Sequence, residues 1–118
     1  MTIYPSQIME TGNESSLAVL FSRENCDILV TGDRGGFGER ILLKTANLPD
    51  LEVLVAGHHG ARDSTCEELL RATTPEIVLI SVGENHYGQP APEVLERLQK
   101  YGCAVYRTDI QGNLIIRR

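Results

Sequence analysis

The chain has 118 residues, of which 42% are hydrophobic and 23% are charged, and its formal net charge is −5. This length fits one domain, or part of one, and excludes two ordinary domains. We expect neither a membrane-spanning helix nor a secretion signal within these residues, because no apolar run approaches the roughly 20 residues that a span needs. The negative charge also counts against a general electrostatic attraction to nucleic acid.

The cysteines give no sign of a disulfide framework or a zinc ribbon. Cys26, Cys66 and Cys103 are odd in number and widely spaced, and the chain contains no CxxC pair. Free cysteine is among the most frequently buried residue types. We therefore interpret the three as small core residues.

The first half of the chain predicts a hairpin, a helix and a third strand. The first dozen residues fit no strong pattern, but residues 16–21 and 26–32 are apolar runs joined by a polar turn. From Phe37 the apolar residues follow helical spacing until Pro49 ends the helix. Residues 51–57 then form a third predicted strand.

The second half predicts two more helices and three more strands. A helix begins near Ser64 or Thr65, either of which is suited to cap it. Residues 76–83 are almost all apolar and predict a strand that is covered on both faces. A helix from Pro92 to Tyr101 follows, and residues 103–109 and 113–118 are expected to pair as strands. The element order predicts a mixed α/β (α+β) domain in which helices cover a sheet.

Polar side chains follow three of the predicted strands, where each strand ends. They are Asp33 after residues 26–32, His58 and His59 after residues 51–57, and Asn85, His86 and Gln89 after residues 76–83. In α/β sheets, ligand sites lie outside the carboxyl ends of the strands, so parallel strands would gather these loops at one edge. A carboxylate and imidazoles together have the composition of a zinc or manganese site.

Each of these residues also has a structural interpretation. Asp33 follows a glycine and is therefore suited to a turn or a helix cap. One of two adjacent histidines commonly forms hydrogen bonds only with the backbone. His86 is suited to an exposed position or to supporting a ligand. The ligand count is also short: a catalytic mononuclear zinc site needs three protein ligands and a two-metal site needs more. The chain has no HxH, HxxxH or HExxH motif. We therefore do not expect it to build a complete hydrolytic centre alone.

Five segments, in this order and spacing, resemble the second half of a metallo-β-lactamase-like domain. They are NESSLAVLF, DILVTGD, LEVLVAGHHGARDST, PEIVLISVGENHYGQP and YRTDIQGNLII. GHHG together with SVGxNxYGxP narrows the resemblance to the C-terminal domain of ComEC-type competence proteins, which bring DNA into naturally transformable bacteria. The resemblance implies half of an αββα sandwich over residues 1–118, with the family's HxHxDH motif lying in a missing first half.

The resemblance also implies roles for individual residues. Asp33 would bridge two divalent ions (zinc or manganese), and His58, with His59 as the fallback, would be a further ligand. Asn13 would be a weak contact or a support for other ligands, and Asn85, His86 and Gln89 would support the site or touch substrate. The family usually has YGHP and HHGS where this chain has YGQP and HHGA, so Gln89 replaces a histidine. Gln89 can form hydrogen bonds but cannot serve as a proton shuttle.

The function implied is metal-dependent hydrolysis of DNA during uptake, in a parent protein of the bacterial cell membrane whose domain lies outside the cytoplasm. Its partners would be DNA, the missing half of the domain and a membrane channel domain. Two ions are expected in the intact domain, whereas the chain alone, without HxHxDH, is expected to be soluble and inactive and need bind no ion. The alternatives are a degenerate non-catalytic module in DNA import and a stand-alone hydrolase of small molecules. Half a sandwich would expose an apolar face, so we expect the chain to self-associate.

Overall fold

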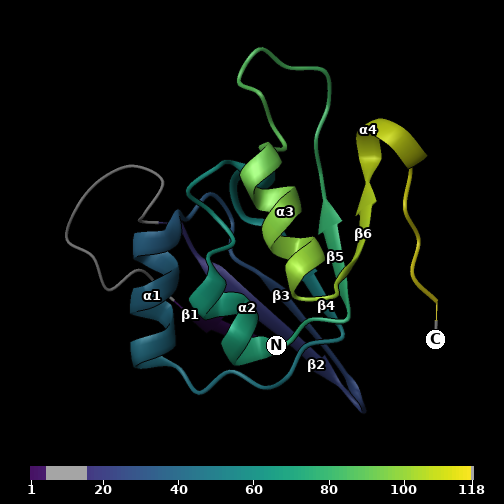
Figure 1. The fold of residues 1–118 in the computed structure, drawn as a ribbon. Coiled ribbons are helices and arrows are strands. Elements are labelled where there is room, and N and C mark those ends of the chain that lie inside the picture. Colours follow the sequence, from purple (N-terminus) through teal and green to yellow (C-terminus); the bar gives the residue numbers. More distant parts are fainter. Residues whose placement is uncertain (5–15, 118) are drawn as a thin grey trace.

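The computed structural model describes residues 1–4 and 16–117, and it contains one sheet with helices packed against it (Figure 1). The strands are β1 (Thr2–Tyr4), β2 (Ala18–Arg23), β3 (Cys26–Val30), β4 (Val53–Val55), β5 (Ile77–Ile80) and β6 (Ala104–Arg107). The helices are α1 (Gly36–Thr45), α2 (Glu67–Thr73), α3 (Pro92–Lys100) and α4 (Thr108–Gln111), with a 3₁₀ turn at Gly57–Gly60. The predicted mixed α/β class is confirmed.

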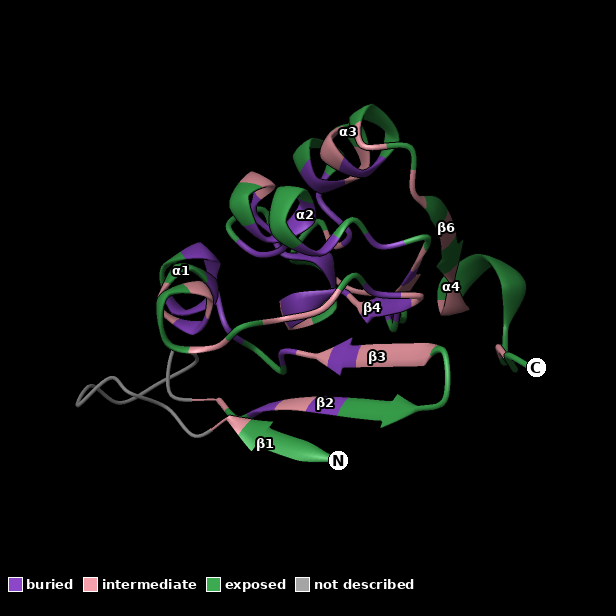
Figure 2. Cartoon of the chain, turned by 90° about the horizontal axis from the view of Figure 1, so that it is seen from below, coloured by how far each residue is buried: buried purple, intermediate pink, exposed green. Residues whose placement is uncertain are grey.

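The six strands lie in the sheet in their sequence order. The pairs β1–β2 and β2–β3 are antiparallel, which confirms the hairpin, whereas β3, β4, β5 and β6 run parallel. From β3 onward each crossover contains one helix and advances the sheet by one strand in the same direction. Because such crossovers are right-handed, α1, α2 and α3 lie on the same face, as Figure 2 shows.

The core lies between this face and the helices. One row of side chains from neighbouring strands, formed by Leu20, Leu29, Leu54 and Val78, is almost fully buried there. Leu69 and Leu70 of α2 and Val94 and Leu98 of α3 belong to the same buried cluster. No helix in the described part of the chain is long and apolar enough to cross a membrane.

Four expectations differ from the structure. β1 was not expected and adds a strand to the edge at β2. On β5, Val78 and Ile80 are buried but Ile77 and Leu79 are only half-buried, so the strand is fully covered on one face alone.

The predicted strand at residues 113–118 is wrong for the part that the structure describes, because residues 113–117 form no strand. The chain leaves the sheet through α4, where the Gln111 side chain accepts the Arg107 backbone N–H at 2.7 Å. The predicted caps are also wrong. Cys66 is the N-cap of α2, and its side chain makes no capping hydrogen bond. The Ser64 hydroxyl does not cap the helix either, because it donates to the Arg34 carbonyl oxygen at 2.9 Å.

The face opposite the helices carries an apolar row across the whole sheet. The row consists of Ile3, Val19, Val30, Val55, Leu79 and Tyr106, each paired with the next, and all are half-buried or exposed.

We therefore expect the chain to self-associate through this face, because association buries the apolar row. Light scattering should then give a mass above that of the monomer. Val19→Lys should lower the associated fraction, because it places a charge in the row. Ile110→Lys is the matched control, since Ile110 is exposed on α4 and outside the row. A monomeric mass for the unmodified chain would refute the expectation.

Candidate functional site

The loops that follow β3, β4 and β5 lie together at the carboxyl edge of the sheet, as the parallel pairing requires. The His58 backbone N–H donates to the Gly32 carbonyl oxygen at 2.8 Å, which joins the TGD turn to the GHHG turn. The ring of His59 lies with Nδ1 2.7 Å from the carbonyl oxygen of Ser81, directly after β5. The two adjacent histidines thus connect the ends of three neighbouring strands.

The backbone of the histidine pair is unusual. His58 has φ 48° and ψ 44°, and His59 has φ 56° and ψ 28°, so both lie in the left-handed region. Residues other than glycine seldom adopt this conformation, and where they do the surrounding structure enforces it, often at a functional site. Here the contacts of both histidines with neighbouring loops supply that constraint.

The glycines on either side allow the turn to fit between its neighbours. A Cβ at Gly57 would lie 3.0 Å from both the Arg34 carbonyl oxygen and the Thr31 Oγ1. A Cβ at Gly60, where φ is +80°, would lie 2.8 Å from the Cβ of Pro90. Only glycine fits such close approaches without movement of a neighbour.

The contact with Ser81 orients the ring of His59. A carbonyl oxygen only accepts hydrogen bonds, so Nδ1 of His59 donates to Ser81, and Nε2 is left for another partner. Histidines that bind metals commonly use this arrangement, in which a backbone carbonyl orients one nitrogen and the other faces the ion. The His58 ring is half-buried, with its centroid 6.4 Å from that of His59.

Asp33 lies in an exposed turn after β3. The N-cap of α1 is Gly35 and no side chain caps this helix, so Asp33 does not have the capping role that its position also suggested. The structure shows no hydrogen bond or ion pair between the Asp33 carboxylate and another described side chain. Among the described residues, therefore, no structural partner would compete with a cation for the Asp33 carboxylate.

A buried polar network lies beneath these loops, and the sequence interpretation missed it. Arg34 is almost fully buried and donates to the carbonyl oxygens of Ser16 at 2.7 Å, Tyr4 at 3.1 Å and Gly38 at 3.4 Å. These contacts connect the chain before β2, the end of β1 and the first turn of α1. The turn that carries Asp33 is thereby anchored by the next residue along the chain.

Glu39 of α1 is fully buried and reaches the start of α2. Its carboxylate accepts the backbone N–H groups of Thr65 at 2.7 Å and Cys66 at 2.8 Å. Burial raises the pKa of Glu39 above its ordinary 4.5, against the opposing effect of these hydrogen bonds. Three glycines precede Glu39 in RGGFGE, at the N-cap and in the first turn of α1, and they are the one sequence signal that another element approaches closely here.

The cysteine at this junction is unreactive. Burial is the main reason that the pKa of the Cys66 thiol is raised to about 12, and the nearby Glu39 adds to the effect. The thiol is therefore protonated at neutral pH, as expected for a packing residue rather than a nucleophile.

The loop between β5 and α3 is organised by Asn85. Its Nδ2 donates to the carbonyl oxygens of Gly83 at 3.0 Å and Gln89 at 2.8 Å, and its Oδ1 accepts the backbone N–H groups of Tyr87 at 3.0 Å and Gln89 at 3.1 Å. The Asn85 amide therefore shapes its own loop. His86 is exposed and Gln89 is half-buried, while Asn13 lies outside the described residues.

The donors at this edge have the right chemistry for a divalent ion but are too few. One carboxylate and two imidazoles suit zinc or manganese. Within residues 1–4 and 16–117, however, no three His, Cys, Asp or Glu side chains form a group that could hold an ion. A complete centre at this edge would take ligands from outside the described residues.

The chain is similar to three curated proteins. Recombination protein 2 of Haemophilus influenzae is 34% identical over 108 residues, which cover 91% of this chain and 14% of that protein. ComE operon protein 3 of Bacillus subtilis is 34% identical over 103 residues, covering 86% of the chain and 13% of that protein. Competence protein ComA of Neisseria gonorrhoeae is 38% identical over 89 residues, covering 74% of the chain and 13% of that protein.

No family model matches the chain. The chain spans about one seventh of the length of each curated relative. The homologues are competence proteins, and the similarity supports a ComEC-type competence family for this chain.

Proposed function

We propose that this chain is the C-terminal half of a metallo-β-lactamase-like domain, and that the intact protein uses it to hydrolyse DNA during uptake. The similarity to competence proteins supports the biological role. The observation that carries the catalytic part is the hydrogen bond from His58 to Gly32, because it sets the turn of Asp33 directly beside the histidine pair. The parent would lie in the bacterial cell membrane, with this domain outside the cytoplasm.

In this proposal each residue at the strand ends has one role. Asp33 would hold the divalent ions, zinc or manganese, through its carboxylate. His58, or else His59, binds one of them through a ring nitrogen, and the contact with Ser81 favours Nε2 of His59 as a ligand atom. Two such ions supply a hydroxide nucleophile and neutralise charge on the phosphate. Arg34 and Glu39 hold the turns in place from below.

Ligands from another part of the intact protein complete the centre in this proposal. They would include the HxHxDH motif, on a second half-domain that covers the apolar row of the sheet.

A test of the proposed function uses the intact protein with single- and double-stranded DNA. Cleavage should stop when divalent ions are chelated and return when Mn²⁺ or Zn²⁺ is added back, because the ions activate the nucleophile. The variants His58→Asn and His59→Asn then identify the ligand, since asparagine tolerates the left-handed backbone that both positions need. The ligand variant should need more metal for half-maximal rate, and the other variant should not.

The second candidate is a non-catalytic module that guides DNA. The short ligand set in the described residues and the glutamine at position 89 favour it. Intact protein that binds DNA but cuts none with either ion would support this candidate and overturn the catalytic proposal. The third possibility, a small-molecule hydrolase, has less support because the relatives are competence proteins.

A further inference from the structure

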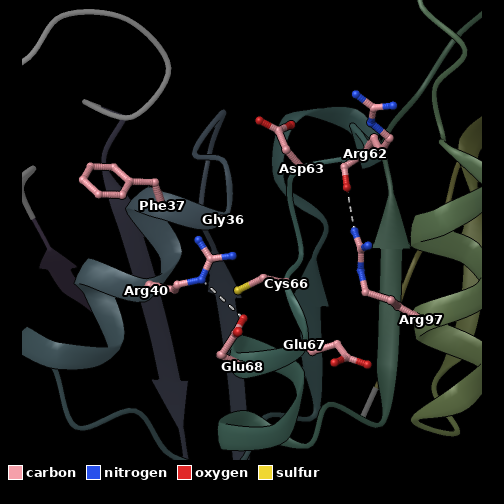
Figure 3. A pocket seen from close by; sticks show the side chains of 9 residues that line it. All are labelled: Gly36, Phe37, Arg40, Arg62, Asp63, Cys66, Glu67, Glu68 and Arg97. Carbon is pink, nitrogen blue, oxygen red and sulfur yellow. Dashed lines mark hydrogen bonds and ion pairs between the residues drawn. The ribbon is translucent and has the colours of Figure 1, made fainter.

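Two adjoining hollows lie on the helix side of the carboxyl edge, next to the candidate site. The larger has a volume of about 670 Å³ and lies between α1, α2 and α3 (Figure 3). The smaller, of about 530 Å³, lies under the loop between β5 and α3. Arg62 and Asp63 line both, so the hollows meet at the loop that follows the GHHG turn.

An exposed aromatic side chain stands in each hollow. Tyr87 lines the smaller hollow and is 87% exposed, and Phe37 lines the larger and is 54% exposed. Figure 1 shows that the loop carrying Tyr87 extends beyond the ends of the strands. This loop has a defined shape, because Asn85 makes four hydrogen bonds within it. Tyr87 is therefore presented to solvent by an ordered support.

Arginines lie between the two aromatic residues. Arg62 is exposed, and Figure 3 shows its side chain at the rim of the larger hollow, with Arg40 on α1 and Arg97 on α3. Arg97 is fixed, since it donates to the carbonyl oxygens of Arg62 at 2.7 Å, Ser64 at 3.0 Å and Thr65 at 3.3 Å. These acceptors are neutral carbonyls, and the positive charge of Arg97 also interacts with the buried Glu39 carboxylate.

The acidic residues of the larger hollow are mostly neutralised by neighbours. Glu68 pairs with Arg40 at 3.5 Å and Glu67 with Lys100 at 2.8 Å. Asp63 is exposed, and the structure shows no cation paired with it among the described residues. Arg62, whose side chain pairs with no carboxylate among the described residues, is therefore the charge that an anionic ligand would meet, opposed by Asp63 and, in the smaller hollow, by the exposed Glu93.

We propose that Tyr87, Arg62 and Phe37 form a track that binds single-stranded nucleic acid beside the candidate catalytic edge. An unpaired base stacks on Tyr87, the adjoining phosphate pairs with Arg62, and Phe37 is a second stacking surface further along. Exposed aromatic rings alternating with arginine suit a single strand, because stacking requires bases that are not already paired. The inference rests on the proposed function and deepens it, because it names the form in which DNA reaches the site.

The test measures binding of a fluorescently labelled single-stranded oligonucleotide to the intact protein by anisotropy, with divalent ions chelated so that nothing is cut. Tyr87→Ala should weaken binding about 10-fold, whereas Tyr87→Phe, which keeps the ring, should bind within about twofold of the unmodified protein. Arg62→Gln should weaken binding, and it should reduce the slope of log affinity against log salt concentration by about 1, as expected for the loss of one phosphate contact. Asp63→Asn should tighten binding, a change that general damage to the fold would not produce.

An oligonucleotide with abasic sites separates stacking from a structural role. Against it the unmodified protein and Tyr87→Ala should bind equally, because there is no base to stack. The track is overturned if Tyr87→Ala loses the same affinity for normal and abasic strands, or loses no affinity for either. It is also overturned if the unmodified intact protein binds no single-stranded oligonucleotide. The two proposals fail separately: DNA cutting without Tyr87 dependence overturns the track alone, and Tyr87-dependent binding without metal-dependent cutting overturns only the catalytic function.

Discussion

Replacing Asp33 by asparagine is expected to lower the rate at which the intact protein cuts DNA in Mn²⁺ by about 100-fold or more. Asparagine matches aspartate in size and keeps one carbonyl oxygen, but it has no charge and cannot bridge two cations. The loss should be partly recovered at high Mn²⁺, because the first consequence is weaker metal binding. Initial rates measured over a range of Mn²⁺ concentrations check this expectation.

The position of Asp33 makes the substitution specific. The side chain is exposed and caps no helix, so Asp33→Asn should leave the midpoint of thermal unfolding nearly unchanged. Asp50→Asn is the matched control, since Asp50 is also exposed but precedes β4 and so lies toward the opposite end of the strands. DNA cutting by Asp33→Asn at the unmodified rate would remove Asp33 from the centre.

The sequence predicted that the loops after β3, β4 and β5 would share one edge of the sheet, because that placement depends on topology. Strands alternating with helices from residue 26 onward imply parallel neighbours, and parallel neighbours place Asp33, His58 and Ser81 at one edge. Topology alone fixes this placement, without any side-chain detail. The hydrogen bonds from His58 to Gly32 and between His59 and Ser81 supply that detail, which the local pattern does not contain.

What the sequence could not predict depends on contacts between distant residues. Ser64 and Thr65 are residue types that often cap helices, but Thr65 has φ 54°. The backbone N–H groups at the start of α2 donate instead to the Glu39 carboxylate, which lies 26 residues before Thr65 and 27 residues before Cys66 in the sequence. The short strand β1 exists through its pairing with β2. The apolar run near the C-terminus looks like a strand, yet Gly112 with φ 73° and ψ −140° directs the chain away from β6.

Replacing Glu39 by leucine is expected to lower the free energy of unfolding of the chain by about 3 kcal/mol, because the N–H groups of Thr65 and Cys66 lose their buried acceptor. Glu39→Gln should cost less, about 1–2 kcal/mol, since its amide oxygen can still accept one of them. Denaturant unfolding monitored by circular dichroism measures both values. The same substitution would loosen α1 against α2, and with it the turns that carry Asp33 and the histidine pair.

The pH dependence of stability distinguishes the charge of Glu39 from its shape. Its pKa is raised in the folded state, so between 4.5 and that raised value the folded chain binds more protons than the unfolded chain. The free energy of unfolding should therefore fall as pH rises through this interval, and Glu39→Gln should remove that fall. Glu67 is the control with the opposite sign, because Lys100 lowers the pKa of this surface carboxylate and its small contribution is lost as pH falls. If Glu39→Gln kept the same pH profile as the unmodified chain, Glu39 would not be the buried titrating group that joins the two helices.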